Sequence, residues 1–398
     1  MDIRRMEGLL RATIDPNQHS AADEELNKVE NIPGVAPALL QIIMSHGVGM
    51  PIRQAGVHHL KKFILNSWSV EDTTRFQLRD QDRAVIRDAL VDAAVEAPQI
   101  IRSELCECIG YICKADFPTR WPSLVDDIVI YLQSPDAAGY PGALSGFRVL
   151  VKSFDHKRGD ERVPLDEAVD TLLPLVQQIM VRVLPDDSPQ ALMIQRLALK
   201  TFYALIQYQL PLGERGSCTR FQQWMELVKH VLARTNPELE KNPVEDEERQ
   251  GLEEHDWWKS KKWTIRILYV IFKRYGSPGG MTKDTATDYL SNFSEGATPV
   301  VLQILETHRS GNFVADKVML EGSLYLQVVK ASLQHDLIPP PIAEEKDETS
   351  HGHEPQSHDG DEIYEEPVEA LENLGRLSKT KTSLPKNDEV NVVSKTTN

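Results

Sequence analysis

Three cysteines in one short stretch are the first residues of this sequence that could bind a metal ion. If residues 106–113 are helical, Cys106 and Cys108 point about 200° apart, so they cannot share an ion. Cys106 and Cys113 share a face, but they lie seven residues apart, which is too far for one ion without a break in the helix. We therefore interpret all three as buried structural thiols.

A second candidate metal-binding group lies near the C-terminus of the sequence, where His351, His353 and His358 precede Asp359 and Asp361. Imidazole and carboxylate bind transition metals, but the surrounding acidic segment predicts no fixed geometry, so we expect no physiological site. The sequence contains no glycine-rich phosphate loop, nucleophile elbow or HExxH pair. We therefore predict neither an enzyme nor a cofactor.

Residues 51–68, PIRQAGVHHLKKFILNSW, predict a helix with two different faces. At about 100° per residue, one face is a broad apolar stripe: Ile52, Gly56, Leu60, Phe63, Ile64 and Trp68. The opposite face carries Gln54, His58 and Lys61, with Lys62 beside them. We interpret these four residues as candidates for contact with a partner. The alternative is that the two lysines only solvate an exposed face.

Arg53 lies beside the apolar stripe, so its predicted role differs from that of the two lysines. The planar guanidinium group carries several donors, and we predict that it contacts a carboxylate or free carbonyls of the next helical repeat. We also interpret three tryptophans, Trp68, Trp121 and Trp257, as structural.

Residues 257–275 predict a second helix with a basic stripe, made of Lys259, Lys262, Arg266 and Lys273. Its apolar side contains Trp257, Leu268, Ile271, Phe272 and Tyr275. Aromatic residues among lysines can bind nucleic acid, but here the aromatic side is predicted to be core. We therefore favour a basic surface that meets acidic groups over a nucleic-acid site.

Those acidic groups lie immediately upstream, in residues 238–256, which contain nine acidic and two basic residues. The densest run is Glu245, Asp246, Glu247 and Glu248. We predict a long solvated loop that either lies over the basic helix or competes for basic partners.

The sequence pattern around these residues predicts helices. From residue 3 to about 335, apolar residues recur at helical spacing, and Pro and Gly punctuate the pattern into about fifteen segments. The segments pair into hairpins of roughly 40 residues, the size of HEAT repeats. We predict an all-α fold, a right-handed α-solenoid of about seven to eight HEAT-type helical hairpins. A globular helical bundle is the alternative.

Composition narrows the class of partner. The chain of 398 residues has 60 acidic and 44 basic residues, which argues against general affinity for nucleic acid or anionic membranes and favours basic protein partners. Four cysteines are too few for a disulfide framework, and no stretch approaches the ~18–20 apolar residues of a membrane span. Residues 337–398 carry fourteen acidic and six basic residues, and we expect disorder there.

Several motifs, in order along the chain, resemble the importin-β superfamily. RQAGVHHLKKFI followed by Trp68 resembles the importin-β N-terminal domain, and KADFPTRWPSLVDDI at 114–128 is similar to an element of a later repeat. LIQYQLP at 205–211 and WWKSKKWTIRILYVIFKRYGSPG at 257–279 resemble the importin-seven and importin-eight group. The resemblance covers roughly residues 2–330, and the chain looks like the N-terminal third of such a receptor.

The resemblance implies a nuclear import receptor without enzymatic activity, whose first repeats bind the small GTPase Ran in its GTP form. The inner helices of those repeats make the contact, so Gln54, His58, Lys61 and Lys62 become candidate Ran-binding residues. Basic cargo and nucleoporins are the further partners implied, with no direct nucleic-acid binding and no membrane insertion. The implied location is the cytoplasm and nucleus, with passage through the nuclear envelope.

Three regions are expected: residues 1–105 as the importin N-terminal, Ran-binding type of repeats, 106–335 as further HEAT repeats, and 336–398 as an acidic and then Ser/Thr/Lys-rich tail. Two alternatives remain open. One is an export receptor of the same architecture, and the other is a truncated helical scaffold that sequesters partners without completing transport.

Overall fold

The structure is a computed structural model that describes residues 2–29, 32–68, 78–207, 219–275 and 292–334. These residues form fifteen α-helices and no strand. Fourteen of the helices make seven consecutive pairs: α1 (Ile3–Ile14) with α2 (His19–Val29), α3 (Val35–Met44) with α4 (Met50–Ser67), α5 (Asp80–Glu96) with α6 (Gln99–Asp116), α7 (Leu124–Gln133) with α8 (Tyr140–Ser153), α9 (Val163–Val183) with α10 (Pro189–Ile206), α11 (Thr219–Ala233) with α13 (Asp256–Tyr275), and α15 (Thr298–Arg309) with α16 (Asp316–Gln334). The fifteenth, α12 (Asp246–Glu253), lies between α11 and α13, and short 3₁₀ or π turns occupy Ala137–Gly139, Gly159–Arg162 and Asn292–Ala297.

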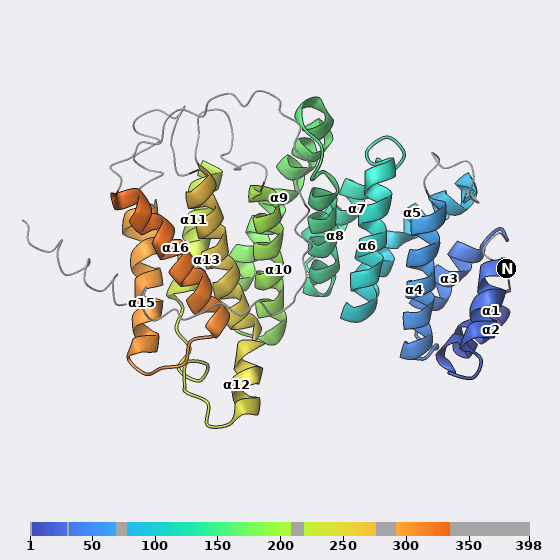
Figure 1. Cartoon of the computed structure of the whole chain (residues 1–398). Helices are drawn as coiled ribbons and strands as arrows, with labels where there is room; N and C mark the ends of the chain where they lie inside the picture. Colours follow the sequence, from blue (N-terminus) through green and yellow to red (C-terminus); the bar gives the residue numbers. More distant parts are fainter. Residues whose placement is uncertain (1, 30–31, 69–77, 208–218, 276–291, 335–398) are drawn as a thin grey trace, which may run out of the picture.

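The pairs stand side by side in a single row, from α1 and α2 at one end to α15 and α16 at the other (Figure 1). From α4 onward, the second helix of each pair packs on the second helix of the next: α4, α6, α8, α10, α13 and α16 follow one another, and we call this the B layer. The first helices form a parallel layer behind it. Because each pair packs on its neighbours in the row, the fold is a solenoid, and the predicted helical hairpins are confirmed.

Proline sets where several helices begin. Pro51, Pro141, Pro164, Pro189 and Pro299 all occupy the first turn of a helix, where the missing N–H has no intrahelical partner to lose. One continuous hydrophobic core runs along the row from Met6 to Leu326. The expected division between residues 105 and 106 falls inside α6, and the core continues across it.

A recurring contact joins the two helices of a pair. The last carbonyls of any α-helix lack intrahelical donors, and in four pairs a polar side chain from the early turns of the second helix donates to carbonyls at the end of the first. We call these contacts hairpin caps: Arg53 to Ile43, Arg102 to Ala94 and Ala97, Gln195 to Val183, and Lys261 to Leu232. They fix the angle at which each pair folds back on itself.

The prediction of a long solvated loop over residues 238–256 was wrong in part. Asp246–Glu253 form α12, a helix with no buried residue, whose N-cap position is Glu245. The run of acids favours this helix because carboxylates in a first turn interact well with the helix dipole. The segment contacts the basic helix, where Lys259 Nζ lies 2.5 Å from Glu254 Oε2. It also docks on the turn between α15 and α16: Phe313 N donates to Glu240 O (2.8 Å), and Asp316 N to Glu253 Oε1 (2.8 Å).

None of the described helices is both long and apolar enough to cross a membrane. The expectation of disorder after residue 337 concerns residues outside the described ranges.

Candidate partner-binding surface

Helix α4 buries the apolar stripe predicted for it. Ile52, Leu60, Phe63 and Ile64 are buried, and so is Arg53. Arg53 Nε donates to Ile43 O at 2.7 Å. This carbonyl belongs to α3, the preceding helix of the same pair, and not to the next repeat, because the early turns of α4 lie beside the end of the helix they fold back on.

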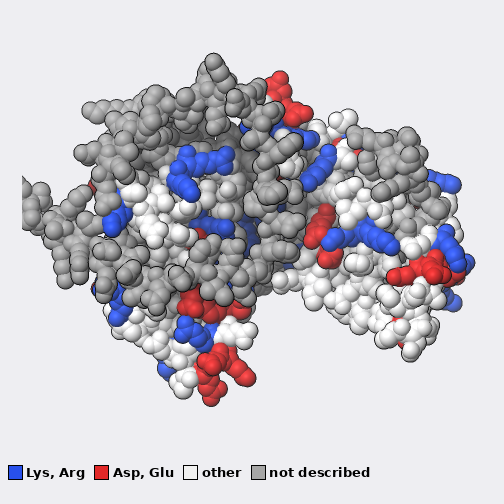
Figure 2. Space-filling model, in the orientation of Figure 1, with Lys and Arg blue, Asp and Glu red and all other residues white. Residues whose placement is uncertain are grey.

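One of the four candidate contact residues on α4, Lys61, forms ion pairs within the chain. Its Nζ is 2.9 Å from Glu104 Oε2 and also contacts Glu107, both on α6. Burial lowers the pKa of Lys61, but the hydrogen bonds to the two glutamates outweigh it, so the pKa is raised. Figure 2 shows basic side chains over α4 beside acidic ones over α6. Lys61 therefore joins two repeats.

Lys62 faces the other neighbour. Its Nζ lies 3.2 Å from Asn27 Oδ1 on α2, because consecutive residues of a helix point about 100° apart. His58 is exposed and Gln54 is half-buried. The four candidates thus do not form one uniform stripe: Lys61 bridges forward along the row, Lys62 bridges back, and His58 and Gln54 lie at the surface.

A residue that the sequence did not single out, His59, adds to this surface. Its Nε2 lies 3.7 Å from Asp23 Oδ1 on α2, and burial lowers the pKa of the imidazole. The His58 and His59 rings meet edge to face with centroids 6.1 Å apart. No spacing rule could identify His59, because its partner lies on another helix.

Beside Lys61 the B layer is hollowed between α4, α6 and α8. The hollow has a volume of about 340 Å³ and is lined among others by Lys61, Leu65, Glu107, Tyr111, Lys114 and Lys152. Leu65 is exposed at its edge, and Tyr111 Oη donates to the Leu65 carbonyl at 3.0 Å. An apolar floor with charges of both signs around it suits a protein segment with mixed side chains.

Behind this surface, Asp116 organises the joint between three consecutive elements. It is almost fully buried and accepts hydrogen bonds from Trp68 Nε1 at 3.2 Å and Arg87 Nη1 at 2.7 Å, and pairs with Arg120 Nε at 3.2 Å. Trp68, Trp121 and Trp257, interpreted as structural, are each at most 2% exposed. The sequence analysis did not single out Asp116, although this residue lies in the KADFPTRWPSLVDDI motif.

The predicted basic stripe lies on the solvent side of α13. Lys259 Nζ is 2.5 Å from Glu254 Oε2, Lys273 Nζ donates to Tyr269 Oη at 2.9 Å, and Arg266 Nη1 is 3.7 Å from Glu321 on α16. Lys262 Nζ lies 5.2 Å from the centre of the Trp263 ring. Trp257, Leu268 and Ile271 are buried on the opposite side.

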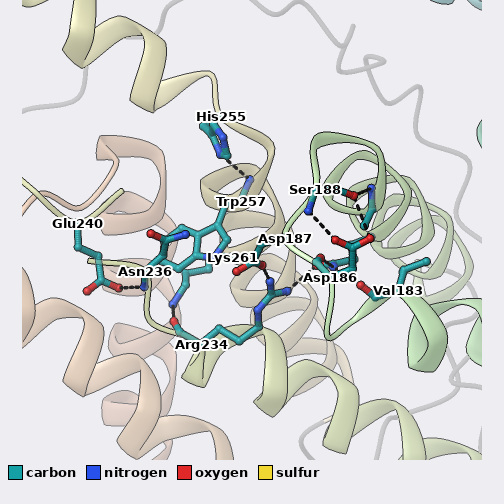
Figure 3. Close-up of polar contacts among 12 residues, drawn as sticks. Val183, Asp186, Asp187, Ser188, Arg234, Asn236, Glu240, His255, Trp257 and Lys261 are labelled. Carbon is teal, nitrogen blue, oxygen red and sulfur yellow. Dashed lines mark hydrogen bonds and ion pairs between the residues drawn. The ribbon is translucent and has the colours of Figure 1, made fainter. Parts of the chain in front are cut away.

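Lys261, in the same KSKK run, has the opposite environment (Figure 3). It is 3% exposed, and its Nζ donates to Leu232 O at 2.7 Å and Arg234 O at 2.6 Å, at the end of α11. Burial lowers the pKa of Lys261 to about 7, against the opposing effect of Glu240.

Arg234 extends this network to the preceding hairpin. It donates to Gln195 Oε1 at 2.9 Å and contacts Asp187, while Gln195 Nε2 donates to the Val183 carbonyl at the end of α9 (2.7 Å). Figure 3 shows Arg234 between Lys261 and Asp187. Two hairpin caps are therefore linked into one network.

Cys106, Cys108 and Cys113 are buried free thiols, as predicted. Burial raises the pKa of Cys106 to about 12 and that of the other two still further. Within the described ranges, no group of three His, Cys, Asp or Glu residues could hold a metal ion. His351, His353 and His358 lie outside those ranges.

Comparison with known proteins places the chain in a family. Residues 22–96 match the family model of the importin-β N-terminal domain. Human (Homo sapiens) Importin-8 is 37% identical over 335 residues, covering 82% of this chain and 32% of that protein. The chain belongs to the importin-β superfamily.

Solved structures of the superfamily share the fold. The exportin Cse1 in its cargo-free, cytoplasmic state matches with a TM-score of 0.65 and 18% identity, over 83% of this chain and 34% of that chain. Yeast importin-β (Kap95p) matches with a TM-score of 0.57 and 15% identity, over 86% of this chain and 37% of that chain. The chain spans about a third of the length of the curated Importin-8 relatives that it matches.

Proposed function

We propose that this chain is the N-terminal, Ran-binding part of a nuclear import receptor, which binds Ran in its GTP form and moves between cytoplasm and nucleus. The observation that carries the proposal is the position of the family match. Residues 22–96 include α4 with its four candidate residues, and also most of α2, whose Asn27 and Asp23 contact Lys62 and His59. The similarity to Importin-8 supports the import direction.

The contact surface that we propose for Ran·GTP is the exposed side of α4, centred on His58, Lys62 and Gln54. Lys61 takes part indirectly, because its pairing with Glu104 and Glu107 holds α4 and α6 in register. A GTPase that binds several B-layer helices at once would favour one spacing between the repeats. That spacing can weaken binding of cargo elsewhere on the row, and cargo must then weaken Ran by the same factor.

Basic proteins are the cargo class that the charge of the chain supports. The formal net charge is −16, and an acidic solenoid attracts basic partners over distances comparable to the Debye length. Nucleoporins remain further candidate partners by family resemblance.

The experiment is a charge reversal confined to the exposed part of α4. We expect a His58→Glu, Lys62→Glu variant of the whole chain to bind Ran loaded with a non-hydrolysable GTP analogue at least ~10-fold more weakly than wild type. Charged residues at the exposed edge of an interface steer association and fix the orientation of the partner. Isothermal titration calorimetry measures the affinity, and circular dichroism checks that melting is unchanged.

The control is Lys241→Glu, which makes a change of the same kind at an exposed position between α11 and α12. Lys61 is left intact, because reversing its charge would break the pairing between α4 and α6 and confuse binding with stability. Equal affinity of the double variant and the control variant would contradict the proposed surface.

A further inference from the structure

A second surface on the B layer has a different chemistry from the one around α4. On α10 and α13, three cations surround one half-buried indole, Trp263. Lys200 Nζ and Lys262 Nζ each lie 5.2 Å from the ring centre, and Arg266 Cζ lies 5.5 Å from it. Tyr203 meets the same ring edge to face, with centroids 5.1 Å apart. Figure 2 shows basic side chains over this part of the row.

Helix α16 adds apolar surface to the same place. Leu320 and Leu324, one turn apart, are 40% and 37% exposed. Glu321, next to Leu320, pairs with Arg266 on α13 at 3.7 Å, so α16 packs against the helix that carries two of the three cations. We call the whole surface the basic–aromatic patch: Lys200, Tyr203, Lys262, Trp263, Arg266, Leu320 and Leu324.

Cations around an aromatic ring, next to exposed leucines, fit a peptide that carries both carboxylates and apolar side chains. The carboxylates would pair with the cations, and the apolar side chains would cover the rings and the leucines. The acidic run of α12 does not serve this purpose. Glu245, Asp246, Glu247 and Glu248 are exposed, and α12 docks instead on the turn before α16.

One segment of the chain has the required composition. Residues 361–374, DEIYEEPVEALENL, contain six acidic residues and no basic one. Val368, Leu371 and Leu374 recur three residues apart, with Ile363 and Tyr364 ahead of them. This spacing is typical of one face of an amphipathic helix, and such helices bind partners by laying the apolar face on an apolar surface.

The segment can also reach the patch. Between Gln334, where α16 ends, and Asp361 lie 26 residues, which can span up to about 85 Å. The path back from Gln334 to Glu321 is thirteen residues of helix, or about 20 Å. Chain length therefore does not prevent an intramolecular contact.

We propose that the basic–aromatic patch is a docking site for acidic amphipathic peptides and that residues 361–374 of the same chain occupy it. The acidic residues of the segment meet Lys200, Lys262 and Arg266, while its apolar residues lie against Trp263, Leu320 and Leu324. This inference is independent of Ran binding. It adds a competitor, built into the chain, for any acidic partner that approaches α10, α13 and α16.

The first test is zero-length carbodiimide cross-linking of the full-length chain as a monomer, read by mass spectrometry. Cross-links from Lys200 and Lys262 to carboxylates within 361–374 are expected at low salt, together with their loss at 0.5 M salt, about where the Debye length falls below 5 Å. Lys114 and Lys152, in the hollow between α6 and α8, serve as reference lysines. Cross-linking of the segment to the reference lysines at the same yield would overturn the proposal.

The second test uses a synthetic peptide of residues 361–374 and a full-length variant in which the six acids are amidated: Asp361→Asn, Glu362→Gln, Glu365→Gln, Glu366→Gln, Glu369→Gln and Glu372→Gln. The peptide is expected to bind this variant at least ~10-fold more tightly than wild type, because the site is vacated. Adding Arg266→Gln to the variant should weaken the peptide again. Equal affinity for variant and wild type would show that the segment does not occupy the patch, and binding that ignores Arg266→Gln would place the peptide elsewhere.

Discussion

At the scale of single residues, neighbours in the sequence have opposite roles. Lys61 and Lys62 reach α6 and α2, respectively. Lys261 is buried, whereas Lys262 is half-buried beside the ring of Trp263. Helical projection separates such neighbours, which is how Arg53 was assigned to the packed side of α4. It cannot name the partner group, because Ile43, Glu104 and Asn27 belong to other helices.

Lys261 is expected to make the stability of the chain depend on pH. It is the lysine among the hairpin caps, a position that Arg or Gln occupies in the other three pairs. Its pKa in the folded chain, about 7, lies below the ordinary lysine value of 10.5. The unfolded chain therefore binds more protons between these two pH values, and stability from this group rises as the pH rises through that window.

Lys261→Gln should remove this dependence while keeping a donor for the α11 carbonyls, as Gln195 does for α9. Between pH 7 and pH 9.5, the free energy of unfolding of the wild type is expected to rise, relative to that of the variant, by on the order of a few kcal/mol. Urea unfolding followed by circular dichroism at the two pH values measures the change. If the difference in free energy of unfolding between wild type and variant stayed constant from pH 7 to pH 9.5, Lys261 would not be titrating with a lowered pKa in the folded chain.

At the scale of elements, the sequence predicted an all-α chain of about fifteen helical segments separated at proline and glycine, because these residues and apolar spacing are local signals. It failed at α12, where a run of acids was interpreted as loop although acids also stabilise the start of a helix. It could not predict the hollow between α4, α6 and α8. That hollow depends on the register between repeats, which no local pattern encodes.

Helix α12 should be the least protected of the helices on its side of the row. It has no buried residue, whereas α13 buries Trp257, Ile265 and Leu268 in the core. Amides of α12 are expected to exchange with solvent at least ~100-fold faster than those in the middle of α13, because local opening exposes little apolar surface, mainly the half-buried Leu252. Hydrogen exchange with mass spectrometry measures both in one sample. Comparable protection of the two helices would mean that the docking of α12 on the α15–α16 turn is far stronger than its contacts indicate.

At the scale of the whole molecule, neighbour-only packing gives a row that can change spacing along its length. Import and export receptors share this architecture, and the sign of the coupling between Ran and cargo separates them. We expect Ran·GTP to weaken binding of a Lys/Arg-rich peptide to the full chain by about 5-fold or more, measured by fluorescence anisotropy. Tighter peptide binding in the presence of Ran·GTP would favour the export reading, and an unchanged affinity would favour a scaffold.

We propose that this superfamily member binds Ran through its first repeats and distinguishes the nucleotide state of Ran. The most direct measurement is the affinity of the full chain for Ran carrying a non-hydrolysable GTP analogue, compared with Ran carrying GDP. We expect at least ~100-fold tighter binding of the GTP form, a difference in binding free energy of about 2.7 kcal/mol. Equal binding of the two forms, or no binding of either, would contradict it.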